Sequence, residues 1–373
     1  MTEKQNIPFF NYQKLFLNDQ QNLEFIFREV SSRGAFIMQD DLANFEASLA
    51  SYTGSKYAIG VANATDALQL LLKAGGVGEG DEVIFCTHTM IATASAIKFT
   101  GAIPIPAEAG YDHLIDPNLI EKLITKKTKA IIPTQLNGRV SDMDKIMNIA
   151  NKYKLQVYED SAQALGARYN GKMAGTFGLG GCISFYPAKI LGCFGDGGAV
   201  LCNSEEIYNK IMLLRDHGRG PDGNISVWGY NSRLDNLQAA FLSHFFQDFD
   251  EIINRRRFLA KLYNDELEDM PQLILPPGPK INNANYDVYQ NYEIEAEDRD
   301  NLINFLLKRG VGTLKQWGGK AVHEYSDLGF TQSLPFTENL MKSSFMLPLN
   351  MFIKNSEIVF VCKTIKEFYL QNT

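Results

Sequence analysis

The sequence of 373 residues has few cysteines, no dense run of basic residues and no long apolar run. Its five cysteines form no C-x-x-C pair, which argues against a structural metal site and indicates reduced thiols. A net charge of −7 without a Lys/Arg-rich tract is atypical of a nucleic-acid binder. Residues 1–6 lack the pattern of a signal peptide, and no apolar run reaches membrane-spanning length. We therefore expect a cytoplasmic protein with no metal, nucleic-acid or membrane partner.

Short β-type runs alternate with helical patterns between about residues 55 and 205, which predicts a mostly parallel sheet with helices on both faces. From about residue 245 a long amphipathic helix leads into a more polar region, so we predict a large domain at 1–247 and a smaller α+β domain at 248–373. The expected strands are residues 58–61, 82–86, 130–133, 156–159, 182–185, 199–202 and 289–294. The expected helices are a segment capped by Ser141 and Asp142 that runs to Tyr153, and residues 299–309 and 356–369.

Lys189 and Asp160 are the pair of residues that carries most chemical information. Asp160 closes an apolar run, and Lys189 follows another and precedes four glycines within residues 192–198. A lysine that can form a Schiff base and an aspartate that can keep a pyridine nitrogen protonated are what a pyridoxal phosphate enzyme requires of its protein. Because reactive groups gather at the carboxyl ends of strands, both residues and Ser184 can converge. Taken alone, Asp160 is more simply interpreted as a helix N-cap, and most lysines are surface charges; it is the setting of Lys189 that argues otherwise.

A phosphate-binding turn is indicated at residues 60–72, where small residues lead into a helix. Free amides at a helix N-terminus bind phosphate, and the Thr65 hydroxyl can add a bond or can simply cap the helix. The glycines of residues 76–80 resemble a dinucleotide loop, but they precede a strand instead of following one, which argues against such a site.

Taken together, these segments resemble the DegT-type sugar aminotransferases, a family of pyridoxal phosphate enzymes of fold type I. The resemblance covers nearly the whole chain. Its marks are residues 34–37, 45–46, 61–68, 80–83, 159–164, 184–198, 229–234 and 347–349.

The resemblance implies a role for each matching residue. Lys189 is the Schiff-base lysine and proton shuttle, Asp160 faces the pyridine nitrogen, and Gln163 donates near the ring oxygen. The implied cofactor contacts also include Ala64, Thr65, Met90, Ser184 and Asn231, and the implied substrate contacts are Tyr186, Arg233, Lys315 and His323. Since the family's equivalent of Asn231 reaches the phosphate from the partner subunit, a homodimer with composite sites is implied. A structural salt bridge is the alternative for Arg233.

The chain departs from the family pattern at several places. Met90 stands where a residue that stacks on the ring is usually aromatic, and Ala64 replaces a usual glycine. Residues 135–138 (Gln-Leu-Asn-Gly) replace a usual His-x-Tyr-Gly, and residues 314–317 (Leu-Lys-Gln-Trp) replace a usual His-Tyr-Pro segment.

The resemblance implies an enzyme that moves an amino group from L-glutamate to a keto group of a nucleotide-linked deoxy sugar, through pyridoxal and pyridoxamine 5′-phosphate. The sequence pattern of residues 192–198 and 231–235 favours C3 over C4 as the aminated carbon. The products would serve surface polysaccharides such as O-antigen, or other glycans. Two alternatives stay open. One is a dehydratase that uses pyridoxamine phosphate, in which the lysine is usually histidine. The other is a catalytically idle regulatory member.

Overall fold

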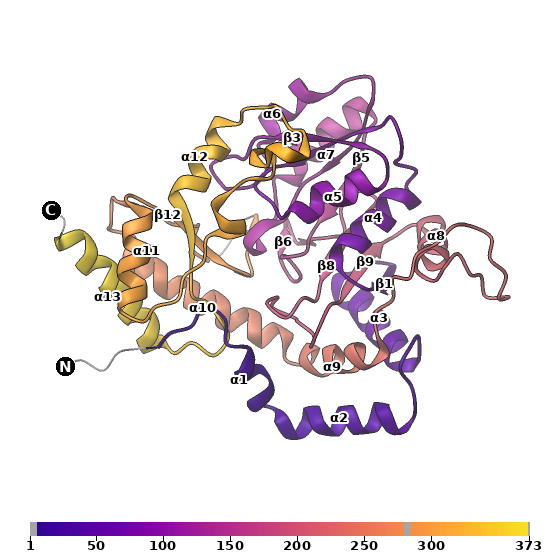
Figure 1. Cartoon of the computed structure of the whole chain (residues 1–373), viewed down its shortest axis with the longest axis horizontal. Helices are drawn as coiled ribbons and strands as arrows, with labels where there is room; N and C mark the ends of the chain where they lie inside the picture. Colours follow the sequence, from indigo (N-terminus) through magenta and orange to yellow (C-terminus); the bar gives the residue numbers. More distant parts are fainter. Residues whose placement is uncertain (1–5, 280–283, 372–373) are drawn as a thin grey trace.

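The computed structural model describes residues 6–279 and 284–371, so the prediction made for residues 1–6 falls almost entirely outside the described residues. Its larger lobe is built on a seven-stranded sheet (Figure 1). Within this sheet β9 runs against its two neighbours, and all other described pairings are parallel. In spatial order the strands are β1 (Tyr57–Val61), β9 (Gly198–Cys202), β8 (Gly180–Ser184), β5 (Gln156–Asp160), β4 (Thr128–Ile132), β2 (Glu82–Cys86) and β3 (Ile103–Ala107).

Side chains along each central strand alternate between two hydrophobic clusters, so both faces of the sheet are buried. In β2, Val83 and Phe85 belong to one cluster, whereas Ile84 and Cys86 belong to the other. This burial on both faces is typical of parallel sheets covered by helices, and it confirms the expected α/β class. Residues of α3 (Asp40–Thr53), α7 (Met143–Tyr153) and α9 (Asn236–Phe246) cover one face, and those of α4 (Ala64–Ala74), α5 (Ile91–Phe99) and α8 (Glu205–Arg215) cover the other.

All six strands expected in this lobe are present. Asp142 caps α7, because its side chain accepts a hydrogen bond from the amide of Lys145. The sequence did not indicate β3. Pro104 and Pro106 argue against a strand in the sequence, because proline lacks the backbone N–H that would bond a neighbouring strand. The strand forms all the same because it lies at the edge of the sheet.

The smaller lobe packs a three-stranded antiparallel sheet against long helices (Figure 1, left). A separate hydrophobic cluster fills it, and Ile7 joins that cluster and pairs with Val311. The domain boundary at residues 247 and 248 stays a prediction. The elements of this lobe are β10 (Leu273–Ile274), β12 (Tyr292–Ala296), β13 (Ser344–Leu347), α10 (Phe249–Leu267), α11 (Arg299–Lys308), α12 (Pro335–Ser343) and α13 (Asn355–Gln371).

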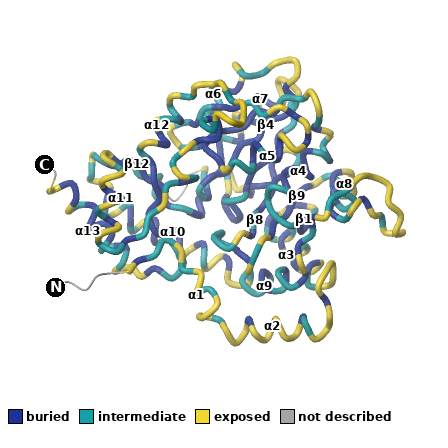
Figure 2. The backbone as a smooth tube through the Cα atoms, viewed as in Figure 1, coloured by how far each residue is buried: buried dark blue, intermediate teal, exposed yellow. Residues whose placement is uncertain are grey.

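Two further parts complete the described chain. Helices α1 (Tyr12–Leu17) and α2 (Gln20–Ser32) run along the outside of the large lobe and are mostly exposed (Figure 2). A small sheet links the lobes through β6 (Arg168–Tyr169), β7 (Lys172–Met173) and β11 (Asn285–Tyr286), and short helical segments occur at α6 (Pro117–Ile120), Glu121–Leu123, Leu136–Gly138, Gln316–Gly319, Val322–Glu324 and Ser326–Leu328. Among the described helices, none combines the length and the apolar character needed to cross a membrane.

Candidate active site

Asp160 and Ser184 end two neighbouring parallel strands, β5 and β8, at the same edge of the sheet. The Asp160 carboxylate is 6% exposed and accepts hydrogen bonds from the Thr93 hydroxyl (2.5 Å) and from the amide of Ala162 (3.2 Å). A turn follows Asp160, not a helix, so its alternative as a helix N-cap is wrong. Hydrogen bonds to the charged form stabilise a buried carboxylate, which suits a group that must face a cationic ring nitrogen.

Lys189 lies in a tight loop that follows β8. The loop turns where the Lys189 amide donates to the carbonyl of Tyr186 (2.8 Å), and a Cβ at Gly192 would come within 2.9 Å of that carbonyl oxygen. Burial lowers the pKa of Lys189 to about 8, although the negative charge of Asp160 opposes this shift. A lysine with such a pKa is partly neutral near physiological pH and can act as a nucleophile and base.

A residue of the small lobe, Gln290, binds the backbone of this loop, and no sequence pattern indicated it. Its side-chain amide accepts from the amide of Ile190 (2.9 Å) and donates to the carbonyl of Ala188 (2.8 Å), so it binds the backbone on both sides of Lys189. The buried guanidinium of Arg256 donates in turn to the carbonyl of Gln290 (2.7 Å). Burial lowers the pKa of Arg256 to about 10.

The predicted phosphate seat forms where β1 leads into α4. Asn63 caps this helix by accepting a hydrogen bond from the amide of Asp66 (2.8 Å), so the interpretation of Thr65 as the cap is wrong. Gly198, the first residue of β9, pairs with Val61 on one side and with Ser184 on the other. A Cβ at Gly198 would collide with the backbone of Asn63. Strand β9 therefore brings Ser184 close to the free amides at the start of α4.

Gln163 lies two residues after Ser161 in the turn behind β5, and its amide has a defined direction. Its Oε1 accepts from the backbone amide of Asn137 (2.9 Å) and from Nδ2 of Asn291 (3.2 Å). The NH₂ end is not used by these bonds, which fits the predicted donor to a ring oxygen.

Three further residues predicted to contact cofactor or substrate are Met90, Tyr186 and Asn231. Met90 occupies the N-cap position of α5 and is partly exposed, and Tyr186, at the start of the Lys189 loop, is half exposed. Asn231 is exposed, whereas the next residue, Ser232, is buried and accepts a hydrogen bond from the amide of Ala62 (3.3 Å).

The remaining predicted substrate residues make contacts away from this centre. Arg233 forms an ion pair with Asp216 (2.8 Å), as its structural alternative required. Lys315 pairs with Asp300 (2.7 Å) at the surface. His323 is buried and lies 3.4 Å from a carboxylate oxygen of Glu338. Their roles in substrate binding remain predictions.

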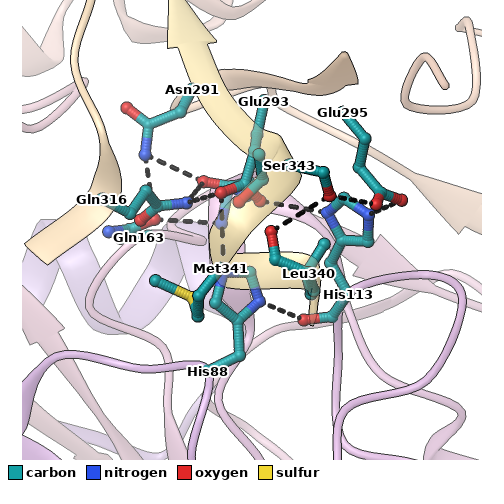
Figure 3. Close-up of polar contacts among 12 residues, drawn as sticks. His88, His113, Gln163, Asn291, Glu293, Glu295, Gln316, Leu340, Met341 and Ser343 are labelled. Atoms are coloured by element: carbon teal, nitrogen blue, oxygen red, sulfur yellow. Dashed lines mark hydrogen bonds and ion pairs between the residues drawn. The ribbon is translucent and has the colours of Figure 1, made fainter. Parts of the chain in front are cut away.

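A buried polar group at the seam between the lobes was not predicted (Figure 3). We call it the Glu293 cluster; it consists of His88, His113, Asn137, Glu293, Glu295 and Gln316. Two of the departures from the family pattern, at Asn137 and Gln316, meet here, since Nε2 of Gln316 donates to Oδ1 of Asn137 (2.9 Å). Among the described residues, no group of three or more His, Cys, Asp or Glu side chains is placed to hold a metal ion.

Together these positions offer one partner for each polar part of pyridoxal phosphate. The buried carboxylate of Asp160 fits a protonated ring nitrogen, and the NH₂ end of Gln163 fits the ring hydroxyl. The helix N-terminus at Ala64 and Thr65 fits a phosphate, and Lys189 fits the aldehyde carbon.

A family model described as the DegT/DnrJ/EryC1/StrS aminotransferase family matches residues 18–366. The chain belongs to this family. Its aminotransferases use pyridoxal phosphate, so the cofactor and the enzyme class predicted from the sequence, a pyridoxal phosphate-dependent sugar aminotransferase, are confirmed.

Relatives are similar over nearly their whole length. A "pleiotropic regulatory protein" of Geobacillus stearothermophilus is 37% identical, with 98% of this chain and 99% of the relative covered. A dTDP-3-amino-3,4,6-trideoxy-alpha-D-glucose transaminase of Streptomyces venezuelae is 34% identical, with 98% and 97% covered. The crystal structure of S. venezuelae DesV with a ketimine intermediate superposes with a TM-score of 0.93 at 35% identity, covering 97% of this chain and 98% of that chain.

Proposed function

We propose that the enzyme moves an amino group from L-glutamate to a keto group of a nucleotide-linked deoxy sugar, with C3 favoured over C4. Its product would serve surface polysaccharide or glycan biosynthesis in the cytoplasm. The observation that carries the proposal is the buried pair of Asp160 and Lys189: the Asp160 carboxylate is held by hydrogen bonds, and burial lowers the pKa of Lys189 to about 8. Named relatives that are transaminases of nucleotide-linked 3-amino sugars support the substrate class and the choice of C3.

Each residue has one task in this proposal. When bound, the cofactor's protonated ring accepts the electron pair that the donor's Cα–H bond releases. Asp160 stabilises the positive charge on the ring nitrogen, and Gln163 donates a hydrogen bond to the ring oxygen. Lys189 would bind the aldehyde carbon of the cofactor and, once free as a neutral amine, would remove the donor's Cα proton and return a proton at another carbon. Ser184, Thr65 and the amide of Ala64 hold the phosphate.

A hollow beside Met90 supports an extended substrate. It lies between the start of α5 and the small-lobe segment that contains Trp317, Lys320 and Tyr325. The two aromatic rings offer apolar surface for a sugar or base, and the lysine offers a charge for a diphosphate. Tyr186, Arg233, Lys315 and His323 remain the candidate substrate contacts implied by the resemblance.

Exposed large apolar residues at two places on the surface support the homodimer. Asn231 and the fully exposed Trp228 (98%) lie on a loop that projects from the body of the large lobe after α8 (Figure 1, right). Phe25 and Phe27 of α2 are also exposed. Large apolar side chains on a surface mark interfaces, and a partner would bring Asn231 of one subunit to the phosphate seat of the other.

Two alternatives are tested together with this proposal. A dehydratase of this family is disfavoured because Lys189 is present. A regulatory member that only binds cofactor is a second candidate, since the Geobacillus relative carries a regulatory name.

The deciding experiment mixes the purified protein with pyridoxal phosphate and then with L-glutamate while its absorbance is followed. We expect a visible band from lysine-bound cofactor and its conversion to the pyridoxamine form, followed by recovery with nucleotide-linked 3-keto sugars. A Lys189→Ala variant should fail to cycle, whereas a variant of the exposed Lys122 should cycle normally. Cofactor binding without conversion would favour the regulatory alternative, and a Lys189→Ala variant that cycles would refute the assigned base.

A further inference from the structure

Glu293 is a carboxylate buried at the seam between the two lobes, where four side-chain nitrogens face it. It is 2% exposed and lies on β12 of the small lobe. Its Oε2 accepts from Nδ2 of Asn137 (2.8 Å), and its Oε1 accepts from Nε2 of Gln316 (2.9 Å). Two ring nitrogens also face it, Nδ1 of His113 at 3.1 Å and Nε2 of His88 at 3.5 Å (Figure 3).

The histidines keep this carboxylate ionised. Burial alone would raise the pKa of Glu293, but His88 and His113 hold it well below its ordinary value. Burial alone would lower the pKa of His113, yet its bonds to Glu293 and Glu295 raise it to about 9. Because an ionised carboxylate has no proton to give, every neighbour of Glu293 must point a donor at it.

That constraint passes along a chain of amides towards Gln163. Asn137 turns its NH₂ to Glu293, so its Oδ1 faces away and accepts from Nδ2 of Asn291 (2.9 Å). The same Nδ2 donates to Oε1 of Gln163 (3.2 Å). Each amide is a donor at one end and an acceptor at the other, so an obligate acceptor at Glu293 sets the direction of Asn137 and Asn291. The backbone amide of Asn137 donates to the same Oε1 of Gln163 (2.9 Å) and favours the same direction at the end of the chain.

The outcome at Gln163 is chemically important because the two ends of an amide have nearly the same shape. Without a fixed direction, the oxygen and the NH₂ group could exchange places at little steric cost. An NH₂ group stabilises an anionic ring oxygen, whereas an amide oxygen repels it.

We propose that Glu293 is a positioning residue for the cofactor: through the side chains of Asn137 and Asn291, and together with the backbone amide of Asn137, it makes Gln163 present its NH₂ group, not its oxygen, to the ring hydroxyl. The inference rests on the proposed role of Gln163. It also gives a task to Asn137, one of the residues at which this chain departs from its family's pattern.

A Glu293→Gln variant tests the direction of the chain, since the new amide can donate to Asn137 and so reverse it. The readout is the pH midpoint at which the visible band of the lysine-bound cofactor changes. Loss of a donor to the ring oxygen should raise this midpoint by about one pH unit, tenfold in the equilibrium constant. Glu295→Gln is the matched control, because Glu295 also bonds His113 but contacts none of the three amides of the chain.

Two further variants complete the experiment. Gln163→Ala should raise the midpoint by itself and should abolish any further effect of Glu293→Gln. Asn291→Leu removes the amide that joins Asn137 to Gln163, and it should shift the midpoint in the same direction by a smaller amount. This variant keeps the test available if Glu293→Gln does not fold.

Each contrary result has its own meaning. Equal midpoints in the Glu293 and Glu295 variants, or an additive double variant of Glu293 and Gln163, would overturn the positioning role while the enzyme still cycles. A wild-type protein that gives no visible band with pyridoxal phosphate would instead overturn the proposed function.

Discussion

The two walls of the active site differ in how their residues reach it. The wall from the large lobe places Asp160, Ser184 and Lys189 at or just past the ends of neighbouring strands, so the chemistry follows from the sheet. The wall from the small lobe consists of Glu293, on a strand of another sheet, and of Gln290 and Asn291, which directly precede that strand; all three touch the large lobe through hydrogen bonds. In the proposed function, one wall supplies the reactive groups and the other holds them in position.

The comparison suggests that substitutions in the two walls should change different properties. A change in the large-lobe wall removes a group that acts on the cofactor, and it should reduce the rate at unchanged stability. A change in the small-lobe wall loosens a support, and it should alter stability, pH dependence or cofactor loading.

The largest effect is expected for Asp160→Asn in the large-lobe wall. A neutral amide cannot hold the ring nitrogen protonated, so the single-turnover rate with L-glutamate should fall by about 10²–10³-fold, as for other lost electrostatic contacts in active sites. Asp144→Asn is the control, because this exposed aspartate bonds Tyr169 and Asn170 outside the site. A rate within a factor of two of wild type would break the division between the walls.

The second prediction concerns the small-lobe wall and pH. His113 has a folded-state pKa of about 9 against an ordinary value of 6.5, so its stabilising contribution is full below pH 6.5 and is lost as the pH rises through 9. Urea unfolding at pH 6 and above pH 9 should differ by about 3 kcal/mol at most from this source. In His113→Gln this difference should largely disappear.

The exposed His217 provides the control for this measurement. It has a positive φ, so His217→Asn suits its backbone and should keep the wild-type pH dependence. If His113→Gln loses stability equally at both pH values, the residue contributes packing and not charge.

The division between the two walls also separates the site residues that the sequence predicted from those that it did not. Lys189, Asp160 and Ser184 could be predicted because each lies at or next to a strand that the sequence pattern indicates. Gln290 was not, since it meets Ile190 across 100 residues of chain and both partners of that contact are ordinary loop residues. No periodicity or local motif encodes a contact between two lobes.

Local competition explains the smaller errors. Asn63 and Thr65 both have side chains that can cap α4, and only the backbone conformation at Asn63 decides between them. Strand β3 was missed because its two prolines forbid a central strand but not an edge strand. Asn137 and Gln316 were noticed as departures from a family pattern, yet their meeting at Glu293 depends on how the lobes close.

The smallest expected effect is the most direct test of the comparison, because it compares two glutamines that hold the same loop. Gln290 of the small lobe binds the backbone at Ala188 and Ile190, and Gln238 of α9 binds both backbone groups of Phe194 further along. Gln290→Leu should free the lysine to sample unproductive positions and reduce the single-turnover rate about tenfold, since small displacements of a reacting group are costly. Gln238→Leu removes the same two kinds of bond from the large lobe and should leave the rate nearly unchanged. Equal losses in both variants would mean that general stiffness of the loop matters, and that the small lobe has no special part in placing Lys189.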